Sequence, residues 1–225
     1  MPLQALTAIP DGRAVEHIRT YFGKLDNGRP RYTGSRFETF GGGGDRNEPN
    51  RVIAGDLIAV SMLSVHVPAQ AAIGILDEMD EEIESLLTQV PVEARIEDLP
   101  DTDFATFFER GAPISILWRL LRQKEDTWGI GQTTASKILA RKRPHLIPIY
   151  DSVIAAQVGI TNSDNQWELW FEAFQGDSGG VLVDRLRAIR EASGQVHLSL
   201  LRVLDVVLWM EGKATKLRGA SARKG

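Results

Sequence analysis

Apolar residues recur every three to four positions along most of the chain, and this helical spacing limits the fold more than any other feature. A half-buried strand requires strict alternation of apolar and polar residues, and no stretch alternates for long enough to build a sheet. The apolar run that starts at Ala54 predicts a buried helix that ends before Pro68. The pattern therefore predicts an all-α protein of about ten helices.

The same spacing predicts where the other helices lie. They are expected at residues 12–22, 69–76, 81–88, 103–110, 113–123, 133–141, 152–158, 166–174, 181–192 and 196–210. Residues 24–51 include four consecutive glycines, so we expect a long flexible loop there, and a second loop at residues 176–180. Residues 212–225 predict a basic, flexible tail. A length of 225 residues is consistent with one all-α domain over residues 1–225.

The composition excludes several kinds of site. There is no cysteine, which rules out disulfides, thiolate zinc sites and cysteine-held iron–sulfur clusters. The four histidines are scattered without metal-ligand spacing, so we expect no metal site and no cofactor, although a monovalent cation at the turn described below is left open. The first residues lack the pattern of a signal peptide, and no apolar run reaches the roughly 18 residues that span a bilayer. We expect a cytoplasmic protein without a membrane partner.

Charge is distributed unevenly along the chain, although the net charge is only −4. Residues 77–109 hold 12 acidic side chains and one basic one. Residues 113–143 hold seven basic and two acidic side chains, and five basic residues with no acid follow Glu211. This asymmetry predicts one face that binds a polyanion. The alternative is a set of solvated helix faces and a frayed tail.

A glycine turn opens one of the expected helices. Helix 113–123, the turn Gly129-Ile130-Gly131 and helix 133–141 together predict a helix-hairpin-helix within residues 113–143. Backbone N–H groups at the start of the second helix would donate to a DNA phosphate, supported by the four side chains Thr133, Thr134, Lys137 and Arg141. The alternative is a plain helix–helix connection with a basic solvent face.

This segment resembles the helix-hairpin-helix superfamily of base-excision DNA glycosylases. Members carry a Leu-Pro-Gly-h-Gly-x-x-Thr-Ala hairpin, a helix, and then an h-Pro-h-x-Asp segment, where h is apolar. This chain has Gly129-Ile130-Gly131-Gln132-Thr133-Thr134-Ala135 and then Ile147-Pro148-Ile149-Tyr150-Asp151, in the same order and spacing. The resemblance covers about 30 residues. It implies a remote member with a two-lobed, glycosylase-like architecture and duplex DNA as its partner.

The resemblance also implies residue roles. Gly129, Ile130 and Gly131 would grip a phosphate, and Asp151 would be the catalytic aspartate. Bifunctional members carry a lysine nucleophile where this chain has Thr133, which cannot form a Schiff base, so lyase activity is not expected. A carboxylate such as Asp151 can stabilise the developing oxocarbenium ion or activate a water.

Aromatic and acidic side chains are candidates for a base pocket. These are Tyr150, Trp128 (which replaces the family's usual proline), Tyr32 and Glu38. The resulting hypothesis is a DNA-binding, monofunctional N-glycosylase of base-excision repair, nucleoid-associated if it binds DNA. One alternative is a non-catalytic DNA-binding protein, and another is a helical protein-interaction domain. Asp151 also fits the N-cap of helix 152–158, a role compatible with catalysis. The base and the oligomeric state stay open.

Overall fold

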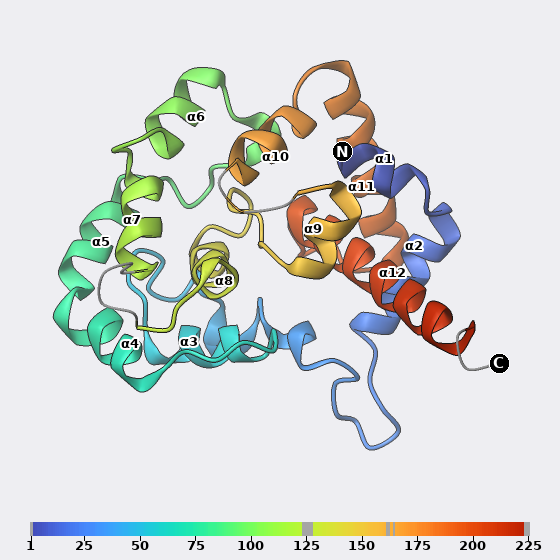
Figure 1. Cartoon of the computed structure of the whole chain (residues 1–225), viewed down its shortest axis with the longest axis horizontal. Coiled ribbons are helices and arrows are strands. Elements are labelled where there is room, and N and C mark those ends of the chain that lie inside the picture. The colour runs from blue at the N-terminus through green and yellow to red at the C-terminus, as the bar shows by residue number, and fades with distance from the viewer. Residues whose placement is uncertain (1, 123–127, 161–162, 164, 223–225) are drawn as a thin grey trace. The chain divides into compact units, whose positions relative to one another are not determined.

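The computed structural model describes residues 2–122, 128–160, 163 and 165–222, without the side chains of 217–222. Across this described part, the regular elements are helices, and the one β pairing is an isolated bridge between Lys24 and Pro30. The prediction of an all-α fold is confirmed. The chain divides into two compact units, whose helices are labelled in Figure 1. Unit 1 is Met1–Tyr32 with Tyr150–Gly225, and unit 2 is Thr33–Ile149.

Unit 1 is organised around its last helix, α12. Its helices are α1 (Pro2–Thr7), α2 (Asp11–Tyr21), α9 (Ser152–Val158), α10 (Gln166–Phe174), α11 (Gly176–Ser193) and α12 (Leu200–Ala222). Helix α12 packs against α2, α9 and α11. Its first half is apolar on nearly every side, and Val203, Leu204 and Leu208 are fully buried. A helix that is apolar all round must lie inside its unit, and α12 therefore forms the centre of unit 1.

Unit 2 is organised around α8 in the same way. Its elements are η1 (Thr33–Arg36), η2 (Phe40–Gly42), α3 (Ala54–Ser61), α4 (Ala69–Ile73), the π-helical η3 (Gly74–Glu78), α5 (Asp80–Thr88), η4 (Ile96–Asp98), α6 (Asp101–Phe108), α7 (Pro113–Arg122) and α8 (Gln132–Lys142). Helix α8 packs against α3 and α7. Every residue from Thr134 to Arg143 is buried. Unlike α12, α8 carries several polar and charged side chains into the interior.

The predicted boundary of α3 was confirmed, whereas that of α11 was wrong. Helix α3 ends at Ser61, before Pro68 as predicted, and the chain then turns through Ser64 at φ 60°. Helix α11 begins at Gly176, so the loop expected at residues 176–180 is helical. A Cβ on Gly179 would lie 2.3 Å from the carbonyl of Phe174, so only glycine lets α11 pass this close to the end of α10.

Most of the segment expected as a basic tail is helical. Helix α12 continues to Ala222. In this part of the chain, a Cβ on Gly212 would meet the side chains of Val153 and Gln157 on α9. Close packing against α9 therefore supports the helix beyond its apolar half. In the described part of the chain, no helix is both long and apolar enough to cross a membrane.

Candidate nucleic-acid interface

The glycine turn lies at the start of α8, as the helix-hairpin-helix pattern predicts. Gly129 and Gly131 are exposed, whereas the side chain of Ile130 between them is buried, at 4% exposure. Ile130 thus anchors the turn, and the glycines on either side face solvent. Gly129 has φ +72°, a conformation that favours glycine. Gly131 is the N-cap of α8, and a Cβ there would meet nothing within 4 Å.

Trp128 holds the turn from the side. A Cβ on Gly74 would lie 2.4 Å from the Trp128 ring, so the indole packs directly on the backbone of η3. A Cβ on Gly129 would lie 3.1 Å from the ring of Pro68. Trp128 was expected as a base-pocket side chain. Its position on Gly74 shows that the indole fixes the turn against η3.

The cations of α8 do not form the basic solvent face that the alternative interpretation predicted. Lys137 and Arg141 are each 3% exposed, and the next two residues, Lys142 and Arg143, are 0% and 1% exposed. The Nζ of Lys137 donates to the carbonyl of Leu63 at 2.9 Å. The prediction that Lys137 and Arg141 present their charge to phosphates from the surface was wrong, because their side chains are turned into unit 2.

The buried cations bind the glycine-rich segment instead. Arg141 donates to the carbonyls of Phe37 and Phe40, and Lys142 donates to those of Gly44 and Glu48. A Cβ on Gly44 would lie 2.6 Å from the carbonyl oxygen of Arg141, so this glycine permits the close approach. The part of the expected flexible loop that belongs to unit 2 is therefore fastened to α8 through its backbone carbonyls.

Asp56 neutralises two of these cations. Its Oδ1 accepts from Nε of Arg141 at 3.0 Å, and its Oδ2 lies 2.6 Å from Nζ of Lys142. Oδ2 also accepts from the backbone N–H of Ile53, which caps the start of α3. The carboxylate is 1% exposed. A buried charge needs both a counter-charge and hydrogen bonds, and this site supplies both.

Arg143 is bound without a paired carboxylate. Its guanidinium donates to the carbonyls of Leu87, Val90 and Pro49, and to Oδ1 of Asn50. Burial lowers the pKa of Arg143 to about 10, with Glu93 acting in the opposite direction. Burial likewise lowers the pKa of the Lys142 ammonium, although the hydrogen bond to Asp56 opposes this. These cations stabilise the packing of unit 2 and are not available to a ligand.

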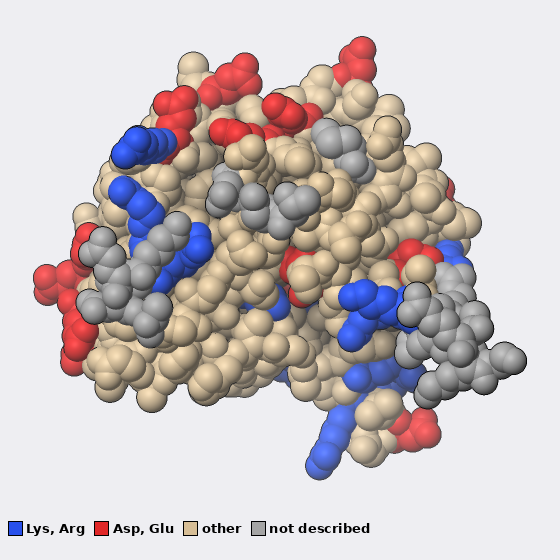
Figure 2. All heavy atoms as spheres, viewed as in Figure 1, with Lys and Arg blue, Asp and Glu red and all other residues tan. Residues whose placement is uncertain are grey.

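Exposed basic groups in this region come from α7. Arg119 is exposed near the end of α7, and the guanidinium of Arg122 lies 5.2 Å from the ring centroid of Trp118. Figure 2 shows basic side chains over the α7 region and acidic ones over the neighbouring α5 and α6 regions. Near the glycine turn, the basic groups at the surface thus come from α7 and not from α8. Lys124 was also counted as basic but lies outside the described residues.

Asp151 is the N-cap of α9. Its Oδ1 accepts from the backbone N–H of Val153 at 2.8 Å, and its side chain is half-buried. The N-cap role that the sequence suggested is therefore present. Asp151 belongs to unit 1, whereas Gly129 to Gly131 and the residues Thr133 and Thr134 belong to unit 2. These candidate residues are therefore members of different units.

The remaining pocket candidates lie in different environments. Tyr150 is buried in unit 1, at 7% exposure. Tyr32 stacks on Tyr21, with ring centroids 5.1 Å apart, and meets Trp209 edge-on. Glu38 is half-buried in unit 2, between η1 and η2. Tyr150 and Tyr32 both contribute to the packing of unit 1, and only Glu38 and Trp128 share a unit with the turn.

Comparison with known proteins gives a family but no function. The structure defines an all-helical protein of two compact units. Residues 14–212 match the family of unknown function DUF6308, and the chain belongs to that family. Neither the curated proteins nor the solved structures contain a significant match.

The sequence patterns did not single out two groups of polar residues that form ion pairs in the structure. Asp56 is a lone acid inside an apolar stretch, and a charge in such a place signals a buried partner. The second group is Arg13 and His17, which are four residues apart on one face of α2. Their partner, Glu211, is 194 residues away from His17, and sequence spacing gives no signal for such a pair.

Proposed function

We propose that unit 2 binds the phosphate backbone of duplex DNA at the turn Gly129-Ile130-Gly131. The observation that carries this proposal is the turn itself, with two exposed glycines on either side of a buried isoleucine at the start of α8. The first N–H groups of a helix have no partner within it, and the helix dipole favours an anion at this end. Glycines allow a phosphate to approach the backbone closely.

The surroundings of the turn support the same partner. The first turn of α8 contains no acidic residue that would repel a phosphate. Helix α7 contributes Arg119 and Arg122 in its last turn. Contacts of this kind recognise the backbone and not the base sequence. Sequence-independent binding to duplex DNA is the expected behaviour.

The chemical part of the proposal is a monofunctional DNA N-glycosylase. Asp151 would stabilise the oxocarbenium ion or activate a water, with the two units as the lobes of a glycosylase-like architecture. Its position at the start of α9 supports this role, since the helix dipole helps to keep a carboxylate ionised. Thr133 stands where a lysine nucleophile would be needed, so strand cleavage is not expected.

DNA binding is tested with Gly131→Val. A Cβ at this position meets nothing within 4 Å, so we expect the variant to keep its fold while the side chain blocks close approach of a phosphate. We expect fluorescence anisotropy with a duplex oligonucleotide to show binding that weakens about tenfold in the variant. Wild-type binding should fall steeply with salt, because phosphate contacts release counterions. Gly12→Val is the matched control, since a Cβ at Gly12 on α2 also meets nothing within 4 Å.

Catalysis is tested with Asp151→Asn on duplexes that carry a panel of damaged bases. Asparagine caps a helix as well as aspartate does, so α9 is retained while the charge is removed. We expect base release by the wild type, loss of release in the variant, and unchanged DNA binding. Binding without release on any substrate would instead indicate a non-catalytic DNA-binding protein. Absence of salt-dependent binding would contradict both proposals and favour a helical interaction domain.

A further inference from the structure

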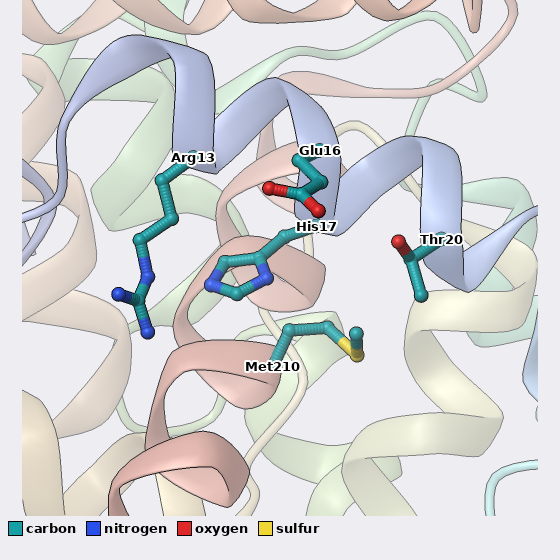
Figure 3. A pocket seen from close by; sticks show the side chains of 5 residues that line it. All are labelled: Arg13, Glu16, His17, Thr20 and Met210. Carbon is teal, nitrogen blue, oxygen red and sulfur yellow. The ribbon is translucent and has the colours of Figure 1, made fainter.

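Unit 1 contains a pocket that the DNA-binding proposal does not use. It has a volume of about 400 Å³, within the range of small-molecule sites. It is lined by Arg13, Glu16, His17 and Thr20 of α2 and by Met210 of α12 (Figure 3). Positions 13, 16, 17 and 20 are spaced three or four residues apart, which places them on one face of α2. One helix face thus brings a cation, a carboxylate, an imidazole and a hydroxyl to a single cavity.

Glu211 of α12 fixes two of these side chains. Its Oε2 accepts from Nε of Arg13 at 2.6 Å and lies 2.8 Å from Nε2 of His17. Burial raises the pKa of the Glu211 carboxyl, but hydrogen bonds from His17 and Arg13 outweigh this and leave it below its ordinary value of 4.5. Glu211 is therefore ionised at neutral pH, and it acts only as an acceptor.

An ionised Glu211 determines the tautomer of His17. Because Oε2 can only accept, Nε2 of His17 carries a proton, and Nδ1 is the ring nitrogen that bears the lone pair whenever the imidazole holds a single proton. Figure 3 shows the His17 ring between Arg13 and Met210, with Glu16 beside His17 on α2. Three groups of α2 can then accept hydrogen bonds at the cavity: the Glu16 carboxylate, Nδ1 of His17 and the Thr20 hydroxyl.

The charges of the pocket favour a cationic ligand. The charge of Arg13 is balanced by Glu211 through their 2.6 Å ion pair. Glu16 is exposed and supplies a further negative charge. In the described part of the chain, no group of three or more acidic or histidine side chains is placed to hold a metal ion. The negative charge of Glu16 therefore suits a singly charged organic cation.

We propose that this pocket binds a small primary amine in its ammonium form. An ammonium group has three N–H donors and no acceptor, which matches the three acceptors of α2. Glu16 would pair with the charge, His17 Nδ1 and Thr20 would accept the remaining hydrogen bonds, and Met210 would contact the alkyl chain. This site lies entirely within unit 1, so it is independent of the DNA-binding turn in unit 2.

The test uses butylamine on the full-length protein, with 1-butanol as the neutral ligand of similar shape. We expect isothermal titration calorimetry to show saturable binding of the amine and none of the alcohol. Glu16→Gln should weaken amine binding about tenfold, because a charge-assisted contact is lost. The matched control is Glu191→Gln, which removes the same charge from an exposed position on α11 of the same unit.

Thr20→Val and amide chemical shifts give independent readouts. Thr20→Val keeps the shape of the side chain and removes its hydroxyl, and it should weaken amine binding several-fold. Amide shifts on titration should concentrate on α2 and the middle of α12. Three results would each overturn the proposal: equal binding of the alcohol, equal effects of Glu16→Gln and Glu191→Gln, or no saturable binding up to about 20 mM amine.

Discussion

The ammonium of Lys142 lies 2.6 Å from Oδ2 of Asp56, and both side chains are 1% exposed. Asp56 also accepts from Arg141, so one carboxylate on α3 holds two neighbouring cations of α8. Through their other donors, the same cations bind the backbone of the glycine-rich segment. Through this network, the glycine-rich residues 37–48 become part of the packed structure of unit 2. The network also explains why α8 carries Arg141 and Lys142, since both side chains bind buried acceptors.

Replacement of Asp56 should destabilise unit 2 strongly. Asp56→Ala leaves Lys142 and Arg141 buried without their counter-charge, and breaking a buried ion pair costs about 3–5 kcal/mol. Urea denaturation should show this loss in the free energy of unfolding. Asp45→Ala is the control, because the Asp45 pair with Arg46 is long, at 3.9 Å, and more exposed. A similar loss of unfolding free energy in both variants would contradict the conclusion that the buried ion pairs of Asp56 stabilise unit 2.

Arg143→Lys should show that the guanidinium shape matters as well as the charge. Arginine donates here to four backbone carbonyls and an amide oxygen, whereas an ammonium has only three donors. We expect a loss of roughly 2 kcal/mol from acceptors left unpaired. Hydrogen exchange should quicken around residues 49–50 and 87–90 while the rest of unit 2 changes little. Unchanged hydrogen exchange in these two segments would contradict the hydrogen bonds that Arg143 donates to them.

Gly74→Ala should displace Trp128. The added methyl would lie 2.4 Å from the indole, and overpacking of this kind costs about 1–3 kcal/mol. Because Trp128 holds the glycine turn, DNA binding should weaken together with stability. Gly55→Ala on α3 is the control, since its nearest contact, at 3.8 Å, is ordinary. If the clash with the indole is the cause, Gly74→Ala should destabilise the Trp128→Leu variant less than it destabilises the wild type. An equal loss of stability in both backgrounds would show that the clash is not the cause.

The ion pairs of Glu211 should make the stability of unit 1 depend on pH in the acid range. The folded protein lowers the pKa of Glu211 below its ordinary value of 4.5, so the unfolded chain binds this proton more tightly. The resulting stabilisation is complete above that ordinary value and is lost as the pH falls through the folded pKa.

Comparison with Glu211→Gln isolates this contribution. The difference in unfolding free energy between wild type and variant should be largest near about pH 7 and should shrink on acidification below 4.5. A difference that stays constant down to about pH 3 would show that Glu211 acts through packing and not through its charge. Glu191→Gln, on an exposed position, should show little pH-dependent difference.

The sequence was sufficient for the elements whose signal is local. Helices α9 and α10 begin and end at the predicted residues, because apolar spacing and N-terminal capping act within a few turns. The turn before α8 was also predicted, since glycines and a helix start lie next to one another in the chain. The early start of α11 was missed because it depends on the fit of Gly179 against Phe174, a contact between two elements.

The charged residues show the limit of sequence reasoning most clearly. The run Arg141-Lys142-Arg143 reads as a solvated basic surface, because a charged side chain is seldom buried. The tertiary structure reverses this, since Asp56, 85 residues before Arg141, and the carbonyls of residues 37–50 together replace water around the cations. The sequence by itself determined the helical class, the glycine turn and the cap at Asp151, all of which depend on near neighbours. Only the tertiary structure decided which charges face solvent, because burial depends on partners brought together from distant parts of the chain.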